Sequence, residues 1–147
     1  MLLNGSHTLN ASPAVVWGKL MDTDILAKIV PGISRLEKIA ENEFEAISEI
    51  KLGPVSGKFS GGLTLTDIEE HKNFTLNVTQ NSKIGNADAE IKISLSDLGN
   101  NQTEISFDGD AKLSGLLART GQRVLSGVAN SLTKQFFENF DEELSAN

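Results

Sequence analysis

The feature that most constrains the fold is a long run of alternating apolar and polar residues from Ile33 to about Leu113. Successive side chains of a β-strand point to opposite faces, so this pattern is typical of antiparallel strands with one buried and one solvated face. Turn residues interrupt the run at regular intervals, at Gly53-Pro54, His71-Lys72-Asn73, Gly85-Asn86 and Gly99-Asn100-Asn101. We therefore expect a meander of strands joined by tight turns, with Gly85-Asn86 as a two-residue hairpin loop.

The inward face of this meander is apolar but contains many small residues. The clearest row alternates with charged and polar residues and consists of Ala87, Ala89, Ile91, Ile93 and Leu95. Glycine and alanine at inward positions indicate a strongly bent sheet or space left for another group to fill. The sequence supports two interpretations of that space equally well, namely side chains of a helix or a bound molecule.

Helix signals precede the meander. Ser12 stands directly before Pro13, which is favourable chemistry for starting a helix, and predicts one from Pro13 to about Met21. Asp22-Thr23-Asp24 offers a cap for a second short helix, which Pro31-Gly32 must end. Before both helices, a weak alternating row predicts a first strand: Leu3, Gly5, His7 and Leu9.

The C-terminal part predicts one long amphipathic helix. Ser114 offers a cap, and no proline interrupts the segment from Gly115 to about Leu144. Gly121 and Gly127 each weaken such a helix by about 1 kcal/mol relative to alanine, which we attribute to close approach of the sheet or a ligand. The order of elements predicts a single α+β domain over residues 1–147, with the last helix in the concavity of a curved antiparallel sheet.

Charge argues against polyanionic partners. The chain has a net charge of -7, and its densest basic grouping, Arg119, Arg123 and Lys134, is spread along the last helix and balanced by acidic residues after it. We interpret these residues as a solvated helix face and expect neither nucleic acid nor an anionic membrane surface to be a favourable partner. The N-terminus lacks the pattern of a signal peptide and no run approaches the length of a membrane span, so we expect a cytoplasmic protein.

The sequence contains few groups that could perform catalysis. It has two histidines and neither cysteine nor tyrosine, and it contains no nucleophile elbow or glycine-rich phosphate loop. The two histidines are far apart, and the acidic residues of the strands mostly point outward, so no metal set can be assembled. We therefore expect a binding protein with no catalytic residues, no metal and no cofactor.

The candidate site is the hollow between the sheet and the last helix. We expect three inward polar residues, His7, Ser48 and Gln80, to orient the polar group of an otherwise apolar ligand. The alternative is that His7 is satisfied by backbone at the sheet edge, and that Ser48 and Gln80 are satisfied by their neighbours. The predicted apolar lining consists of Phe44, Phe59, Leu63, Ile91, Phe107, Leu117, Leu125, Leu132 and Phe136.

Several local patterns, in order along the chain, resemble one family. They are Val16-Trp17 with Leu20, Asp22, Leu26 and Pro31-Gly32, then Gly53-Pro54-Val55 with Phe59 and Gly61, then Gly115-x-Leu117-Ala118-x-x-Gly121, and lastly Phe136-Phe137. Together they resemble the carbon monoxide dehydrogenase CoxG family. This resemblance implies the helix-grip fold of the START-like or Bet v 1-like (SRPBCC) superfamily, which typically holds lipids, sterols, polyketides or quinones between sheet and helix.

The resemblance also implies a set of roles. The family is associated with molybdenum hydroxylases of the carbon monoxide dehydrogenase type, in maturation, membrane attachment or electron transfer to quinones. Our first hypothesis is a carrier of a lipid- or quinone-like molecule that serves such an enzyme. The second is an assembly or interaction factor without a ligand. A cyclase or hydrolase of the same fold ranks third, because no acid and base pair is evident.

The resemblance bears on membranes as well. Longer members of the family carry a C-terminal extension that can serve as an anchor, and this chain ends at Asn147. We therefore expect at most transient membrane contact.

Overall fold

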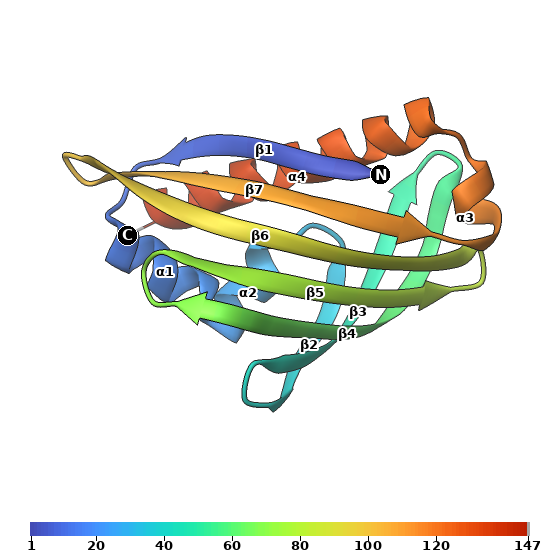
Figure 1. The fold of residues 1–147 in the computed structure, drawn as a ribbon, viewed down its shortest axis with the longest axis horizontal. Helices are drawn as coiled ribbons and strands as arrows, with labels where there is room; N and C mark the ends of the chain where they lie inside the picture. The colour runs from blue at the N-terminus through green and yellow to red at the C-terminus, as the bar shows by residue number, and fades with distance from the viewer. Residues whose placement is uncertain (147) are drawn as a thin grey trace.

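Residues 1–146, the part that the computed structural model describes, form seven strands and four helices (Figure 1). The strands are β1 (Leu2–Leu9), β2 (Ile33–Ala40), β3 (Glu43–Leu52), β4 (Val55–Glu69), β5 (Asn73–Ser82), β6 (Gly85–Gly99) and β7 (Gln102–Leu113). The helices are α1 (Pro13–Leu20), α2 (Thr23–Ile29), α3 (Gly115–Arg119) and α4 (Gln122–Ser145).

All seven strands belong to one antiparallel sheet with the order β1-β7-β6-β5-β4-β3-β2. Strands β2 to β7 form the expected meander, and β1 completes the sheet beside β7. Helix α4 crosses the sheet and packs chiefly against β1 and α2. Figure 1 shows α1, α2 and the C-terminus at one end of the molecule, and α3 with the β5–β6 turn at the other. The predicted α+β helix-grip fold is confirmed.

The two short helices begin where their capping residues predict. The Ser12 side chain accepts a hydrogen bond from the Val15 backbone N–H at 3.4 Å. One carboxylate oxygen of Asp22 accepts from the N–H groups of Asp24 and Ile25 at 3.0 and 3.3 Å. These bonds satisfy donors that the first turn of a helix leaves unpaired.

The prediction of one continuous C-terminal helix is wrong. The segment divides into α3 and α4 at Gly121, whose φ of +102° lies outside the helical region and suits glycine alone. A Cβ at either Gly121 or Gly127 would meet nothing within 4 Å, so close approach of sheet or ligand does not explain either residue. Ser114 does not cap α3 with its side chain, because its hydroxyl accepts from the Asn86 N–H at 3.1 Å.

The predicted hairpin loop is shifted by two residues. Ser82 pairs with Gly85, so the loop between β5 and β6 is Lys83-Ile84 rather than Gly85-Asn86. Gly85 has a φ of +132°, and a Cβ there would lie 2.0 Å from the Ser114 carbonyl oxygen. The glycine is therefore required by the close approach of the chain that leads into α3.

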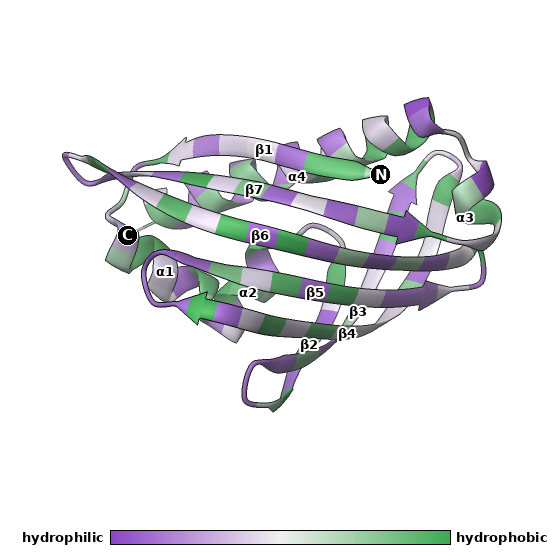
Figure 2. Cartoon of the chain, in the orientation of Figure 1, coloured by the Kyte–Doolittle hydropathy of each residue, from purple (hydrophilic) through white to green (hydrophobic). Residues whose placement is uncertain are grey.

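Apolar and polar residues alternate along the strands (Figure 2), and the buried ones gather in two clusters. The first cluster lies between the sheet, α1, α2 and the C-terminal half of α4. It comprises Leu9, Ala11, Val16, Trp17, Leu20, Ile29, Phe44, Leu65, Phe74, Ile105, Phe137 and Phe140. The second cluster lies towards α3 and comprises Val55, Phe59, Leu117 and Leu125.

Candidate functional site

Between the two clusters, the inward face of the sheet carries a strip of residues that belong to neither. We call Val78, Gln80, Ala89 and Ile91 of β5 and β6 the central strip, and all four are half-buried. Val78 lies directly opposite Ala89. Gly109 on β7 lies opposite Ile91, so the strip continues with no side chain on that strand. The small residues noted in the sequence thus leave the middle of the sheet thinly covered.

The inward residues of helix α4 are divided between the two clusters in the same way as those of the sheet. Val128 packs on the second cluster and Phe136 on the first, whereas Leu132, one turn from each, belongs to neither and is half-buried. Helix α4 approaches β1 and α2 most closely and spans the concavity of the sheet. Leu132 is therefore the α4 residue that lies between the two clusters, as the central strip does on the sheet.

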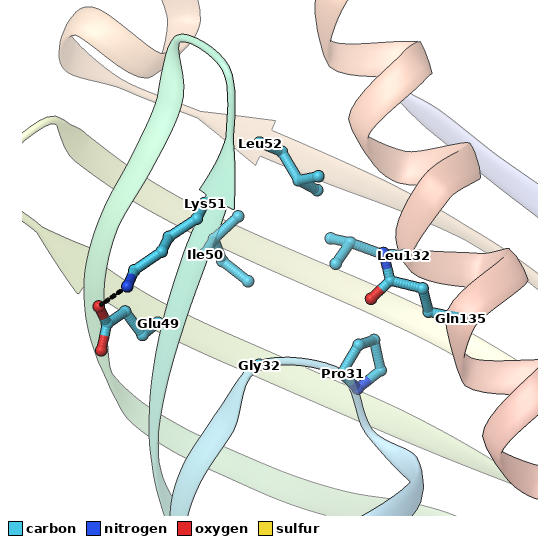
Figure 3. Close-up of a pocket in the computed structure, with 8 residues that line it drawn as sticks. All are labelled: Pro31, Gly32, Glu49, Ile50, Lys51, Leu52, Leu132 and Gln135. Carbon is cyan, nitrogen blue, oxygen red and sulfur yellow. Dashed lines mark ion pairs between the residues drawn. The ribbon is translucent and has the colours of Figure 1, made fainter.

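A pocket of about 210 Å³ opens at this level between β3, α4 and the segment that follows α2. In Figure 3, Leu52 of β3 and Leu132 of α4 point into the same space from opposite sides. Ile50 and Pro31 complete its apolar lining, and the remaining lining residues are Gly32, Glu49, Lys51 and Gln135.

Glu49 and Lys51 border this pocket on β3, but their side chains point away from Leu132 (Figure 3). Lys51 Nζ lies 3.3 Å from a carboxylate oxygen of Glu49, and both side chains are largely exposed. Sites for small organic molecules are mostly apolar with a few placed polar groups, whereas the surface of this pocket is at least as polar as it is apolar. Its volume is below the roughly 300 to 1,000 Å³ of pockets that enclose drug-sized ligands. In this conformation the pocket accommodates a ring or the end of a chain.

His7 lies on the inward row of β1 as expected, with a partner that the sequence did not indicate. Its Nε2 is 3.0 and 2.9 Å from the two carboxylate oxygens of Asp141 on α4. Its ring stacks on Phe137, with centroids 4.7 Å apart. The alternative of a histidine satisfied by backbone is wrong. Contact of His7 with a ligand stays a prediction, and a ligand would compete with Asp141 for Nε2.

Gln80 is the polar member of the central strip. Its Nε2 donates to the Thr79 carbonyl oxygen at 3.2 Å, which identifies the other amide atom as the acceptor Oε1. Within residues 1–146, this Oε1 is the one buried side-chain polar atom without a hydrogen-bond partner. An unpaired buried acceptor costs about 1–3 kcal/mol. Gln80 is thus only half satisfied by its neighbours.

The other inward polar residues differ from Gln80. Ser82 donates to the Gly85 carbonyl oxygen at 2.6 Å and accepts from the Ile84 N–H, so it serves the β5–β6 turn. Ser48 is half-buried on β3 and lies opposite Phe59 on β4. Orientation of a ligand by Ser48 or Gln80 stays a prediction.

The structure separates the predicted apolar lining into three groups. Phe44 is buried in the first cluster, with Leu63, Phe107 and Phe136 packed against it. The second cluster holds Phe59, Leu117 and Leu125. Ile91 and Leu132 alone lie between the clusters. Phe107 also lines a smaller pocket of about 110 Å³ between β1 and α4. Contact of these residues with a ligand stays a prediction.

Sequence reasoning missed several residues of this region. Ile50 and Leu52 line the pocket but were not among the predicted lining residues, and the alternation along β3 was the available signal. Phe137 is more deeply buried than the predicted Phe136, and it was not named as a lining residue. Gln135 lines the pocket from α4, and no local sequence signal indicated this.

Metal binding and membrane spanning find no support in the described part of the chain. Residues 1–146 contain no group of three or more His, Asp or Glu side chains placed to hold a metal ion. None of the helices described is both long and apolar enough to cross a membrane.

A curved antiparallel sheet with a long C-terminal helix across its concavity and two short helices after the first strand defines a START-like helix-grip protein. The chain belongs to the carbon monoxide dehydrogenase CoxG family, whose sequence model matches residues 5–145. The family resemblance noted in the sequence is confirmed. No functionally curated protein matches the chain significantly.

Solved structures agree with this assignment. A conserved protein from Geobacillus kaustophilus is 33% identical, with a TM-score of 0.95 over 99% of this chain and 96% of that one. A START superfamily protein from Mycobacterium smegmatis is 13% identical, with a TM-score of 0.79 over 99% of this chain and 97% of that one. The Zhui aromatase/cyclase from Streptomyces sp. R1128 is 12% identical, with a TM-score of 0.73 over 99% and 93%. The last two show likeness of fold alone.

Proposed function

We propose that this protein binds an apolar small molecule, lipid-like or quinone-like, between the sheet and α4, and acts as its carrier. The observation that supports the proposal is the division of the core into two clusters. Val78, Ala89 and Ile91 face inward, yet neither cluster covers them. When a ligand covers half-buried apolar side chains, removing their surface from water favours binding by about 25 cal/mol per Å² of apolar area.

The pocket between β3 and α4 provides the access route in this proposal. It ends on Leu132, the α4 residue that lies between the two clusters, and Gln135 provides a polar side chain at its rim. An apolar tail would lie along the central strip, and the polar end of the ligand would remain near the rim. The pocket volume requires the ligand to be narrow or α4 to move outward when it binds.

The membership of the chain in this family is the basis for proposing which enzyme the carrier serves. The chain belongs to a family named for carbon monoxide dehydrogenase, so we propose that a molybdenum hydroxylase of that type receives or supplies the ligand. A carrier needs no catalytic residues, and we propose that the chain is not itself an enzyme. The alternative is an assembly factor that acts through its surface with the hollow unoccupied.

Native mass spectrometry tests ligand binding directly. The protein is purified without detergent and incubated with decylubiquinone or with palmitic acid as probes. We expect a one-to-one complex with at least one probe. Ala89→Trp should abolish that complex, because the indole would occupy the space over the central strip. Asp88→Trp is the matched control, since Asp88 is the adjacent outward residue of the same strand.

Two outcomes would contradict the carrier. The first is an unliganded spectrum with both probes, and the second is equal loss of binding in Ala89→Trp and Asp88→Trp. Copurification with the hydroxylase distinguishes the carrier from the alternative, an assembly factor. An Ala89→Trp protein that is folded, binds no probe and retains its partner would show that an assembly role does not use the hollow.

A further inference from the structure

Gln80, the polar member of the central strip, has small residues on both sides of it in the sheet. In the strand pairing it lies opposite Gly61 on β4 and Ala87 on β6. Gly61 in turn lies opposite Ala46 on β3. None of these three neighbours has a side chain that extends beyond Cβ or contains a hydrogen-bonding group. The amide of Gln80 therefore projects from a band of the sheet whose other side chains cannot donate to it.

The backbone beside Gln80 fixes which way its amide is turned. Gln80 Nε2 donates to the Thr79 carbonyl oxygen at 3.2 Å. That oxygen lies where a side chain at Gly61 would begin, since a Cβ there would be 1.9 Å from it. The reverse orientation of the amide would place two acceptor oxygens 3.2 Å apart. Gln80 therefore presents the acceptor Oε1, and not the donor Nε2, as its free group.

The described part of the chain supplies no donor to this oxygen. Gln80 Oε1 is shielded from solvent and receives no hydrogen bond from residues 1–146. Ser82, the next inward residue of β5, donates its hydroxyl hydrogen to the Gly85 carbonyl oxygen at 2.6 Å. Ser48 lies opposite Phe59, one inward position away from the band that contains Gln80. Buried side-chain acceptors nearly always have a donor, so this oxygen needs one from outside the chain.

We infer that Gln80 Oε1 accepts a hydrogen bond from a hydroxyl group on the apolar body of the ligand. The inference rests on the proposed function, because it needs a ligand over the central strip. Val78 lies two residues from Gln80 on the same inward row, and Ala89 lies opposite Val78. A ligand that covers these two residues passes beside the amide. This hydroxyl is distinct from the polar end of the ligand, which remains near the rim of the pocket.

The orientation of the amide makes Gln80 a specificity-determining residue. A hydroxyl group has a hydrogen to donate to Oε1, whereas an ether, ester or ketone oxygen at the same place would set acceptor against acceptor. A plain hydrocarbon segment would leave Oε1 unpaired. Sites built around a hydrogen bond reject analogues that lack the matching group for this reason. The protein should therefore prefer hydroxylated apolar molecules to their deoxy and O-methyl analogues.

Isothermal titration calorimetry with matched ligand pairs tests this preference. Ricinoleic acid and oleic acid differ by a single hydroxyl group on the acyl chain, and octylphenol and octylanisole differ by methylation of a phenolic hydroxyl. We expect the hydroxylated member of at least one pair to bind about tenfold more tightly than its partner. The pair that shows the difference identifies whether an aliphatic or a phenolic hydroxyl reaches Oε1.

Substitution of Gln80 should remove the preference. Gln80→Met deletes the amide and keeps an unbranched side chain of similar length. It should weaken binding of the preferred hydroxylated ligand about tenfold, because the acceptor is lost. Asn81→Leu is the matched control, since it deletes an amide at the adjacent exposed position of β5, and it should keep the preference. Thermal unfolding of both variants establishes that they are folded.

The hydrogen bond itself is observed by NMR of the glutamine side-chain carbonyl carbons. The Cδ signal of Gln80, assigned by its loss in Gln80→Met, should move downfield with the hydroxylated ligand and not with its partner. Equal affinities within both pairs, or a preference that Gln80→Met retains, would overturn the inference and leave the carrier in place. Failure of all four ligands to bind would instead overturn the proposed function, and this inference with it.

Discussion

Nε2 of His7 on β1 lies within hydrogen-bond distance of both carboxylate oxygens of Asp141 on α4, at 3.0 and 2.9 Å. The two residues are 134 positions apart, and their contact connects the first strand to the last helix. Together with the stacking of His7 on Phe137, it fixes the C-terminal part of α4 against the edge of the sheet. The central strip lies further along the sheet, between the two clusters.

Removing this contact should cost a modest amount of stability. We predict that Asp141→Ala lowers the free energy of unfolding by about 1 kcal/mol, since both partners are partly exposed and the bond is screened by water. Glu142→Ala, at the neighbouring exposed position, should change it by less than about 0.5 kcal/mol. Urea unfolding measures both values. Equal effects of the two substitutions would contradict a specific role for Asp141.

The glycines of the C-terminal helices should respond in opposite directions to alanine. Gly127 lies inside α4 with open space around it, so Gly127→Ala should raise the free energy of unfolding by about 0.5 to 1 kcal/mol. Gly121→Ala should lower it, because the φ of +102° at that position is unfavourable for any residue with a Cβ. Thermal and urea unfolding of the two variants report the signs. Stabilisation by Gly121→Ala would show that α3 and α4 form one helix in solution.

Gly85 should be far less tolerant than Gly53. Both have positive φ, but a Cβ at Gly85 would lie 2.0 Å from a backbone oxygen, whereas one at Gly53 would meet nothing within 4 Å. Gly53→Ala should therefore cost about 1 kcal/mol from backbone conformation alone, and Gly85→Ala several times as much. Urea unfolding of both variants gives the comparison. A similar loss in both would show that the chain leading into α3 moves away at little cost.

Core truncation should be most costly where α4 meets the first cluster. Phe140 is fully buried there and contacts Phe136 edge to face, with ring centroids 5.9 Å apart. Phe140→Ala should lower the free energy of unfolding by about 3 to 5 kcal/mol. Val124→Ala, at an exposed α4 position, should cost less than about 1 kcal/mol. Chemical denaturation checks both, and a small loss for Phe140→Ala would contradict tight packing at this end.

Much of the fold could be predicted because its signals are local. Alternation identified the strands and their inward rows, and Ser12, Asp22 and Pro31 marked the limits of α1 and α2. The break at Gly121 was missed because the amphipathic pattern continues through this glycine and gives no indication of its backbone conformation. The shift of the hairpin loop was missed for a related reason. Gly85 is required because the Ser114 carbonyl oxygen lies close to it, and not because it forms the turn.

The candidate site was predicted less well because it depends on contacts between distant segments. The inward residues of the sheet were identified, but the sequence could not separate those covered by the two clusters, such as Phe44 and Phe59, from those left between them, such as Ile91. The contact of His7 with Asp141 likewise forms only when the chain is folded. Periodicity predicts which way a side chain points and does not predict what it meets.

The central claim is that a ligand covers the inward residues which neither cluster buries. Methyl-labelled NMR tests it most directly, by titrating decylubiquinone or palmitic acid into the protein and following individual methyl groups. We predict shifts concentrated at Val78, Ala89, Ile91 and Leu132, with the exposed Val15 and Leu98 unaffected. Shifts confined to exposed methyl groups, or no shifts with either probe, would contradict a ligand in the hollow.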